Sequence, residues 1–167
     1  MDRFYQRVRK ETGVLMEQGK PIGGKYSYDS ENRFPWKGEP DTHVELEYEV
    51  DTIDQEVMEL VSSKFSSHPG HCDLSKVPTT LKQNLESLNW ALENLPHFGR
   101  YEDAMSTKSR YLFHSKLATS INLHRLSPKQ VIDSVDDYLQ YILTDFGDMT
   151  DKLIKIDKVI SKEFEKN

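Results

Sequence analysis

The stretch that decides the fold covers residues 99–131 and reads GRYEDAMSTKSRYLFHSKLATSINLHRLSPKQV. It is locally basic: six lysines and arginines against two acidic residues give it a net charge of +4, whereas the whole chain carries −6. We expect two helices here, over residues 107–123 and 127–142. Ser127 can cap the second, with Pro128 at its first position and Gln130 completing a capping box. Hydroxyl, imidazole and ammonium groups gather where the two helices meet, and this chemistry suits an anion such as a phosphate or pyrophosphate.

Apolar residues recur at helical spacing in three stretches before this one. They predict helices over residues 3–18, 52–65 and 80–95. Gly19 and Pro96 are expected to end the first and the third, while Thr52 and Thr80, each followed by glutamine three residues later, are expected N-caps. The expected core faces are Ile53, Val57, Leu60, Val61 and Phe65 in the second helix and Leu81, Leu85, Leu88, Leu92 and Leu95 in the third. After residue 141, a similar pattern at Leu153, Ile156, Ile160 and Phe164 predicts one more amphipathic helix.

Two other stretches carry a different pattern. Residues 19–42 hold four glycines and three prolines, which predicts a long connection. Residues 43–50 alternate between apolar and polar side chains, which fits either an edge strand or an extended segment lying on helices. In both interpretations Val44, Leu46, Tyr48 and Val50 share one side, and the glutamates at 45, 47 and 49 form a solvated face. We therefore expect a mainly α protein with an N-terminal helix and interdomain-type linker over residues 1–42 and a helical domain over 43–167.

Composition excludes several classes of protein. The 167 residues suit one domain, and no apolar run approaches the roughly 20 residues that a membrane-spanning helix needs, so we expect no membrane. The N-terminus has no apolar signal-peptide core, and with Cys72 as the single cysteine no internal disulfide can form, so the expected location is the reducing cytoplasm. An isoelectric point near 5.5 argues against a surface that binds nucleic acid as a whole.

The strongest metal candidate is the loop over residues 66–78, which contains His68, His71 and Cys72. Structural zinc usually takes four protein ligands, and no second cysteine or histidine pair lies at a suitable spacing, so a solvated loop is the preferred interpretation. No recognisable acid–base pair or nucleophile triad occurs either. We therefore predict no metal ligand and no catalytic residue.

Three short motifs point to a family: FGRYEDAM at residues 98–105, LFHSKL at 112–117 and LSP at 126–128. With the segment over residues 9–33, they closely resemble the bacterial photolyase-related proteins, the iron–sulfur branch of the photolyase and cryptochrome superfamily. The resemblance covers only a middle portion of such a protein. It implies a multi-helix module that corresponds to the interdomain linker and the first part of the helical FAD-binding domain.

The same resemblance assigns a cofactor segment. In photolyases a Thr-Ser-x-Leu-Ser run holds the pyrophosphate of FAD through backbone amides and hydroxyls. The matching residues here are His114, Ser115, Lys116, Leu117 and Ala118, and the resemblance implies that Lys116 places a charge near the phosphates. Ala118 departs from the pattern because a methyl group replaces the last serine, and His124 stands where the family prefers glycine.

What the family does defines the first functional hypothesis. The resemblance implies flavin-dependent, light-driven repair of DNA photoproducts, with DNA as partner and FAD as cofactor. The family's cluster cysteines lie in a later region, so no iron–sulfur cluster is expected in this chain. We expect a truncated or split form, completed by a second photolyase chain, and a homo-oligomer is a further possibility.

Two other hypotheses remain open. The chain could be a non-enzymatic helical interaction protein that has lost flavin binding, which Ala118, His124 and the acidic surface favour. It could also be a small phosphate- or nucleotide-binding module that uses the basic junction alone.

Overall fold

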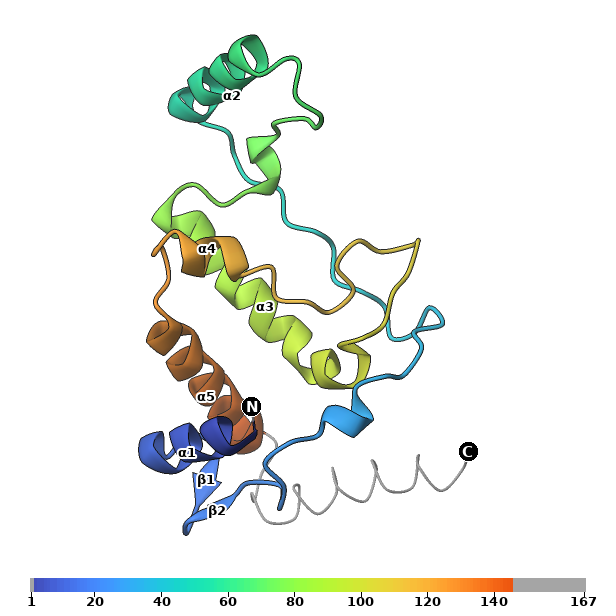
Figure 1. The fold of residues 1–167 in the computed structure, drawn as a ribbon, viewed down its shortest axis with the longest axis vertical. Helices are drawn as coiled ribbons and strands as arrows, with labels where there is room; N and C mark the ends of the chain where they lie inside the picture. Colours follow the sequence, from blue (N-terminus) through green and yellow to red (C-terminus); the bar gives the residue numbers. More distant parts are fainter. Residues whose placement is uncertain (1, 146–167) are drawn as a thin grey trace. The chain divides into compact units, whose positions relative to one another are not determined.

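The computed structural model describes residues 2–145 and confirms the mainly α fold class. Within this range the helices are α1 (Asp2–Thr12), α2 (Thr52–Lys64), α3 (Leu81–Tyr101), α4 (Ala118–Asn122) and α5 (Pro128–Asp145) (Figure 1). The strands β1 (Met16–Glu17) and β2 (Lys20–Pro21) form a small antiparallel hairpin, and two 3₁₀ turns are η1 (Asp29–Glu31) and η2 (Leu74–Lys76). The helix predicted around Leu153–Phe164 lies outside the described residues.

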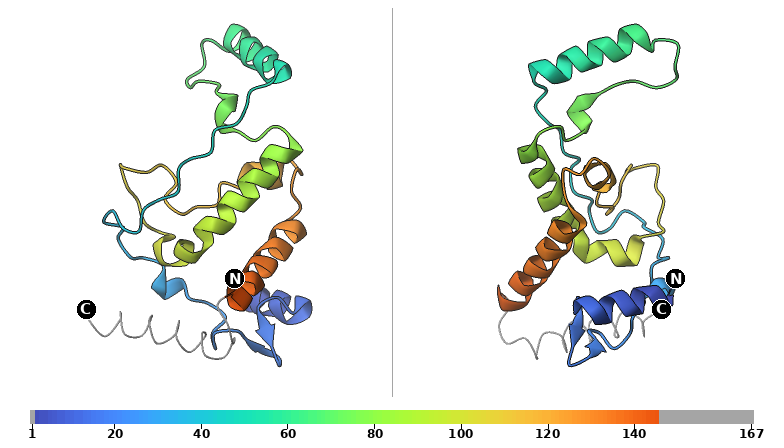
Figure 2. Two further views of the ribbon diagram at one scale, coloured as in Figure 1. Left: turned by 180° about the vertical axis from the view of Figure 1, so that it is seen from behind. Right: turned by 60° about the vertical axis from the view of Figure 1, so that its left-hand side comes forward.

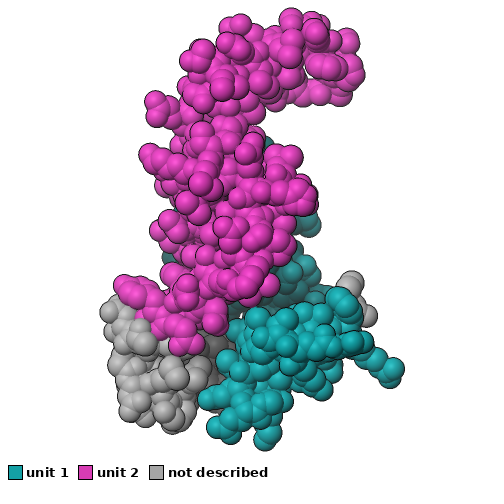
Figure 3. All heavy atoms as spheres, turned by 90° about the vertical axis from the view of Figure 1, so that its left-hand side faces the viewer, with its two compact units in different colours: residues 1–43, 94–114 teal, residues 44–93, 115–167 magenta. Residues whose placement is uncertain are grey.

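The chain divides into two compact units (Figure 3). Unit 1 comprises residues 1–43 and 94–114, and unit 2 comprises residues 44–93 and 115–167. Helix α3 contributes to both units, because its residues up to Glu93 belong to unit 2 and those from Asn94 onward to unit 1.

In unit 1 the first helix is shorter than predicted, because it ends at Thr12 and not near residue 18. Gly13 adopts the left-handed conformation, with φ of 75°, and its amide donates to the carbonyl of Arg9 at 2.9 Å. This is how helices commonly terminate at glycine. The residues that follow form the hairpin, with Met16 opposite Pro21 and Glu17 opposite Lys20. The turn between the strands places Gln18 and Gly19 at φ of 48° and 76°, so the predicted helix stop at Gly19 is a hairpin turn.

The end of α3 also differs from the prediction, because the helix continues through Pro96 to Tyr101. A proline inside a helix removes one backbone donor, but the turns after it can persist when they are packed. Here the rings of His97 and Tyr101 both lie 5.3 Å, centroid to centroid, from the ring of Phe113, which is almost fully buried. Phe34, which lies within the long connection over residues 19–42, is tied to the same helix end, since its amide donates to the carbonyl of Arg100.

The core of unit 2 gathers around the first part of α3. Leu88 and Ala91 of α3 pack with Leu117 and Leu126, and the partly buried Ile121 and Val131 complete the cluster. Figure 2 shows α4 beside α3, in agreement with this cluster.

Residues 44–50 form an extended segment that lies on α3, so the second interpretation of their alternating pattern is confirmed. The Trp90 indole donates to the Val44 carbonyl at 2.8 Å, and the Gln83 amide donates to the Glu49 carbonyl at 2.8 Å. Tyr48 is buried, but Val44 is 88% exposed, so the predicted shared apolar side is wrong at its first position.

Two of the three predicted capping boxes are confirmed. Gln83 bonds reciprocally with Thr80, and Gln130 does so with Ser127. The prediction for α2 is wrong by one residue, because Asp51 is the N-cap and Asp54 is its reciprocal partner. Asp54 also accepts from the Thr79 hydroxyl at 3.1 Å.

The core face predicted around α2 is wrong at four of its five positions, because only Val61 of the five is partly buried. Ile53, Val57, Leu60 and Phe65 are all exposed, and Asp54 is the one buried residue that α2 has. The face predicted for α3 is also wrong at two positions. Leu81 and Leu85 are exposed, while the polar Asn84 and Ser87 are buried.

Candidate functional site

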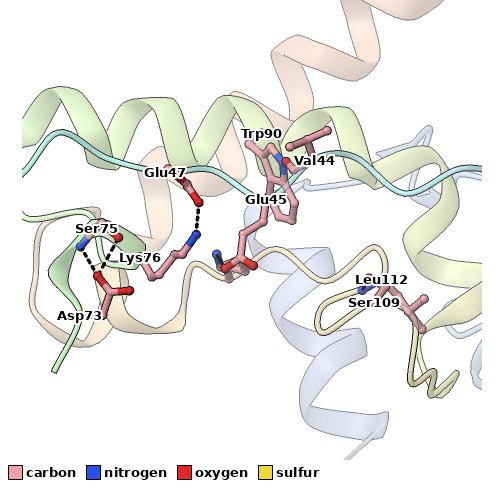
Figure 4. Close-up of polar contacts among 10 residues, drawn as sticks. Val44, Glu45, Glu47, Asp73, Ser75, Lys76, Trp90, Ser109 and Leu112 are labelled. Carbon is pink, nitrogen blue, oxygen red and sulfur yellow. Dashed lines mark hydrogen bonds and ion pairs between the residues drawn. The ribbon is translucent and has the colours of Figure 1, made fainter. Parts of the chain in front are cut away.

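The segment before α4 is a loop, so the helix predicted over residues 107–123 is wrong outside Ala118–Asn122. Three serine hydroxyls accept hydrogen bonds from backbone amides of residues that follow shortly after them in the chain: Ser106 from Lys108, Ser109 from Leu112, and Ser115 from Leu117. Such local bonds compete with the helical ladder. Leu112 and Lys116 also adopt positive φ, at 46° and 59°, which is incompatible with a right-handed helix. Figure 4 includes Ser109 and Leu112 of this loop.

The five residues assigned to a cofactor lie at the end of this loop. His114 is the last residue of unit 1, and its ring makes an edge contact with the ring of Phe98 at 5.5 Å. The other four belong to unit 2. Leu117 is buried in the core, and Ala118 is the first residue of α4.

Lys116 has a specific partner that the sequence pattern did not predict. Its ammonium lies 3.0 Å from the carboxylate of Glu45, and the two side chains are only 14% and 25% exposed. The ammonium also lies 5.8 Å from the ring centroid of Trp90. The prediction that Glu45 belongs to a solvated face is therefore wrong. Glu45 is half of a partly buried ion pair.

The neighbouring glutamate on the same extended segment has its own partner. The carboxylate of Glu47 accepts a hydrogen bond from Lys76 of η2 (Figure 4), which raises the pKa of that lysine. In the adjacent turn, Asp73 accepts from both the amide and the hydroxyl of Ser75, and these bonds lower the pKa of its carboxyl group. Two of the three glutamates on the extended segment, Glu45 and Glu47, are thus each matched with one lysine.

These contacts decide how the segment could receive a diphosphate. The Ser115 hydroxyl accepts from the Leu117 amide and keeps its own proton for donation. The charge of Lys116 is neutralised by Glu45, so a phosphate group would have to displace that carboxylate. Ala118 supplies no side-chain donor. The residues fit a diphosphate only after the ion pair between Lys116 and Glu45 has opened.

We expect His97 to make the stability of unit 1 depend on pH. Burial lowers the pKa of its imidazole below the ordinary 6.5, and the neighbouring His43 lowers it further. The unfolded chain then binds a proton more readily than the folded chain does, so stability should be complete above pH 6.5 and fall as the pH drops below that value. Urea unfolding between pH 5 and 8 measures this, and His97→Phe should flatten the dependence while keeping a ring beside Phe113. An equally steep fall in the variant would contradict the assignment.

Among the described residues, no group of three or more histidine, cysteine, aspartate or glutamate side chains is placed to hold a metal ion. No helix in residues 2–145 combines the length and the apolar character needed to cross a membrane.

Comparison with known proteins gives three findings. Residues 1–76 match the model of the family described as deoxyribodipyrimidine photo-lyase-related protein. The chain is 28% identical over 137 residues to the (6-4) photolyase of Agrobacterium fabrum, a match that covers 81% of this chain and 27% of that protein. It is also 60% identical over 30 residues to an uncharacterized protein of Acanthamoeba polyphaga mimivirus, covering 18% of this chain and 15% of the other.

The similarity covers only part of the photolyase and part of this chain. The chain spans 27% of the length of the (6-4) photolyase, and the family model covers its first 76 residues. The resemblance inferred from the sequence motifs is confirmed: this chain is similar to the photolyase-related proteins over residues 1–76 and to a (6-4) photolyase over 137 residues.

Proposed function

We propose that this chain is a photolyase-related module that acts in flavin-dependent, light-driven repair of DNA photoproducts. The observation that supports this most strongly is the 28% identity to a (6-4) photolyase over 81% of the chain. The chain spans 27% of that relative, so in this proposal the remainder of the flavin pocket and the DNA-binding surface lies outside this sequence, and a complementing chain is one source of it. We assign no catalytic residue to this chain.

Within the proposal, residues 114–118 contact the diphosphate of FAD. The Ser115 hydroxyl would donate to a phosphate oxygen, and the Lys116 ammonium would exchange Glu45 for the diphosphate. Bound FAD would supply the light-driven electron transfer, and the chain's own residues would position it. The cost of opening the ion pair lowers the affinity for FAD, because binding must compete with the carboxylate of Glu45.

The variant Glu45→Gln tests this arrangement. Removing the carboxylate takes away the group that a phosphate would have to displace from Lys116, together with a negative charge near the phosphate position, so the affinity for FAD should rise about tenfold, or about 1.4 kcal/mol. Lys116→Glu should abolish binding. The measurement is a fluorescence titration of FAD with the purified chain, supported by the visible absorption of the protein peak after gel filtration.

Glu47→Gln is the matched control, because Glu47 lies on the same extended segment but bonds to Lys76. It should leave the affinity for FAD unchanged. If parent and Glu45→Gln both stay colourless at high FAD concentration, the assignment of residues 114–118 is wrong.

A second candidate function is a non-enzymatic helical interaction protein. The outward-facing apolar side chains of α2 and the commitment of Lys116 to Glu45 favour it. Large exposed apolar groups are common at protein–protein contacts. A chain that never binds flavin but forms a stable dimer or complex in sedimentation experiments would support this candidate over the first.

A further inference from the structure

A cavity of about 330 Å³ lies within unit 1. Its lining includes Tyr5 and Arg9 of α1, Tyr26 and Asn32 of the segment that follows the hairpin, and Glu102 just after α3. The volume is at the lower end of the roughly 300–1,000 Å³ that is typical of small-molecule sites. None of the lining residues belongs to the 114–118 segment.

One wall of the cavity presents hydrogen-bond acceptors. Asn32 is 94% buried, and its amide nitrogen donates to Glu102 at 3.0 Å and to Asp29 at 3.4 Å. Because carboxylates only accept, these two bonds fix the orientation of the amide. The Asn32 side-chain oxygen is then a buried acceptor that has no hydrogen-bond partner among the described residues. A buried acceptor without a partner is rare in folded proteins, so this oxygen calls for a donor from a ligand.

The cavity also has planar walls. The guanidinium of Arg9 is buried and lies 5.5 Å and 5.4 Å from the ring centroids of Tyr5 and Tyr26. Its side chain donates to three backbone carbonyls, those of Val14, Leu15 and Tyr26, which hold it in place. Flat aromatic and guanidinium faces are the surfaces on which planar heterocycles stack.

We propose that this cavity binds a guanine base. Asn32 and Glu102 both line the cavity, and the Glu102 carboxylate, which accepts from the Asn32 amide nitrogen, provides a second acceptor beside the residue that carries the Asn32 oxygen. Guanine presents two adjacent donors, its ring N–H and its exocyclic amine, on one edge. The acidic side chains Asp29 and Glu102 disfavour a phosphate at this end of the cavity. The base can come from a free nucleoside or nucleotide, or from an unstacked position in a single strand.

Titration calorimetry of the full chain with guanosine, inosine and cytidine tests the donor pattern. Inosine is guanosine without the exocyclic amine, so it should bind about tenfold more weakly, and cytidine should not bind measurably. Glu102→Gln should weaken guanosine binding about tenfold, because a charged acceptor becomes a neutral one. Asp103→Asn is the control, since its carboxylate is exposed and pairs with Arg33. Equal affinities for guanosine and inosine, or an unchanged affinity in Glu102→Gln, would overturn the proposal.

Gly99→Leu tests the cavity without weakening the fold. Gly99 lines the cavity and lies in α3, and a Cβ atom added there meets no other atom within 4 Å. Leucine is a better helix former than glycine, so the midpoint of thermal unfolding should not decrease. The new side chain should occupy the cavity and abolish guanosine binding; full binding in this variant would place the ligand elsewhere.

Competition separates the two sources of the base. Displacement of guanosine by a single-stranded oligonucleotide with one guanine, but not by guanosine monophosphate, assigns the site to a strand, and the reverse result assigns it to a free nucleotide. Absence of guanosine binding at millimolar concentration overturns the proposal. A failure of FAD binding does not affect this test, because the two sets of residues differ.

Discussion

Replacing Phe113 by alanine should lower the free energy of unfolding by about 3–5 kcal/mol. The ring is 2% exposed and contacts the rings of His97 and Tyr101, both at 5.3 Å between centroids. The variant loses the buried ring and leaves a void at the point where α3 continues beyond Pro96. We expect a lower urea midpoint by circular dichroism and faster amide exchange over residues 97–101.

Phe4→Ala is the matched control, since Phe4 is the same residue type in the same unit but is 73% exposed. Its effect should stay within about 0.5 kcal/mol, as is usual for surface positions. Similar losses in the two variants would show that the Phe113 ring does not hold the end of α3 in place.

The parts of the fold that the sequence predicts correctly are those set by local chemistry. The capping boxes of α3 and α5 each need only two side chains three residues apart, so Thr80 with Gln83 and Ser127 with Gln130 could be identified from spacing alone. At α2 two neighbouring residues could cap, and the structure uses Asp51, whose reciprocal partner Asp54 also accepts from Thr79, 25 residues away.

Apolar spacing predicts which side chains share a helix face but not what covers that face. Ile53 and Leu60 of α2 lie on the predicted face, yet both are exposed. Conversely, Asn84 is fully buried because its amide donates to the carbonyls of Pro78 and Thr80. The residue type alone does not reveal such a contact.

The candidate sites depend on contacts between distant parts of the chain. The pair of Lys116 with Glu45 spans 71 residues, and that of Asn32 with Glu102 spans 70. The family resemblance drew attention to Lys116 but gave no partner for it. The apolar pattern does not predict the loop before α4, because serines at 106, 109 and 115 neither support nor oppose a helical pattern of apolar residues. In the structure their hydroxyls accept from nearby backbone amides and stabilise turns.

The second large effect concerns Arg9, whose replacement by methionine should cost about 3–5 kcal/mol of folding free energy. Hydrogen bonds to charged groups contribute about 1.5–3 kcal/mol each, and they are not additive. Arg9 makes three, to the carbonyls of Val14, Leu15 and Tyr26. Leu15 has φ of 53°, which is unfavourable for leucine, so this bond holds a strained residue in place beside the hairpin.

Unfolding of the variant in urea measures the loss, and exchange of the Ile22 amide, which donates to the Leu15 carbonyl, reports on the hairpin. Arg7→Met is the control, because Arg7 lies on the same helix but makes an exposed ion pair with Glu11, and it should change stability by about 0.5 kcal/mol or less. Arg9→Lys should recover only part of the loss, since an ammonium lacks the planar donors that reach three carbonyls. If Arg9→Met and Arg7→Met were equally stable, the buried guanidinium would not hold the hairpin against α1, and the stacking wall of the cavity would lose its support.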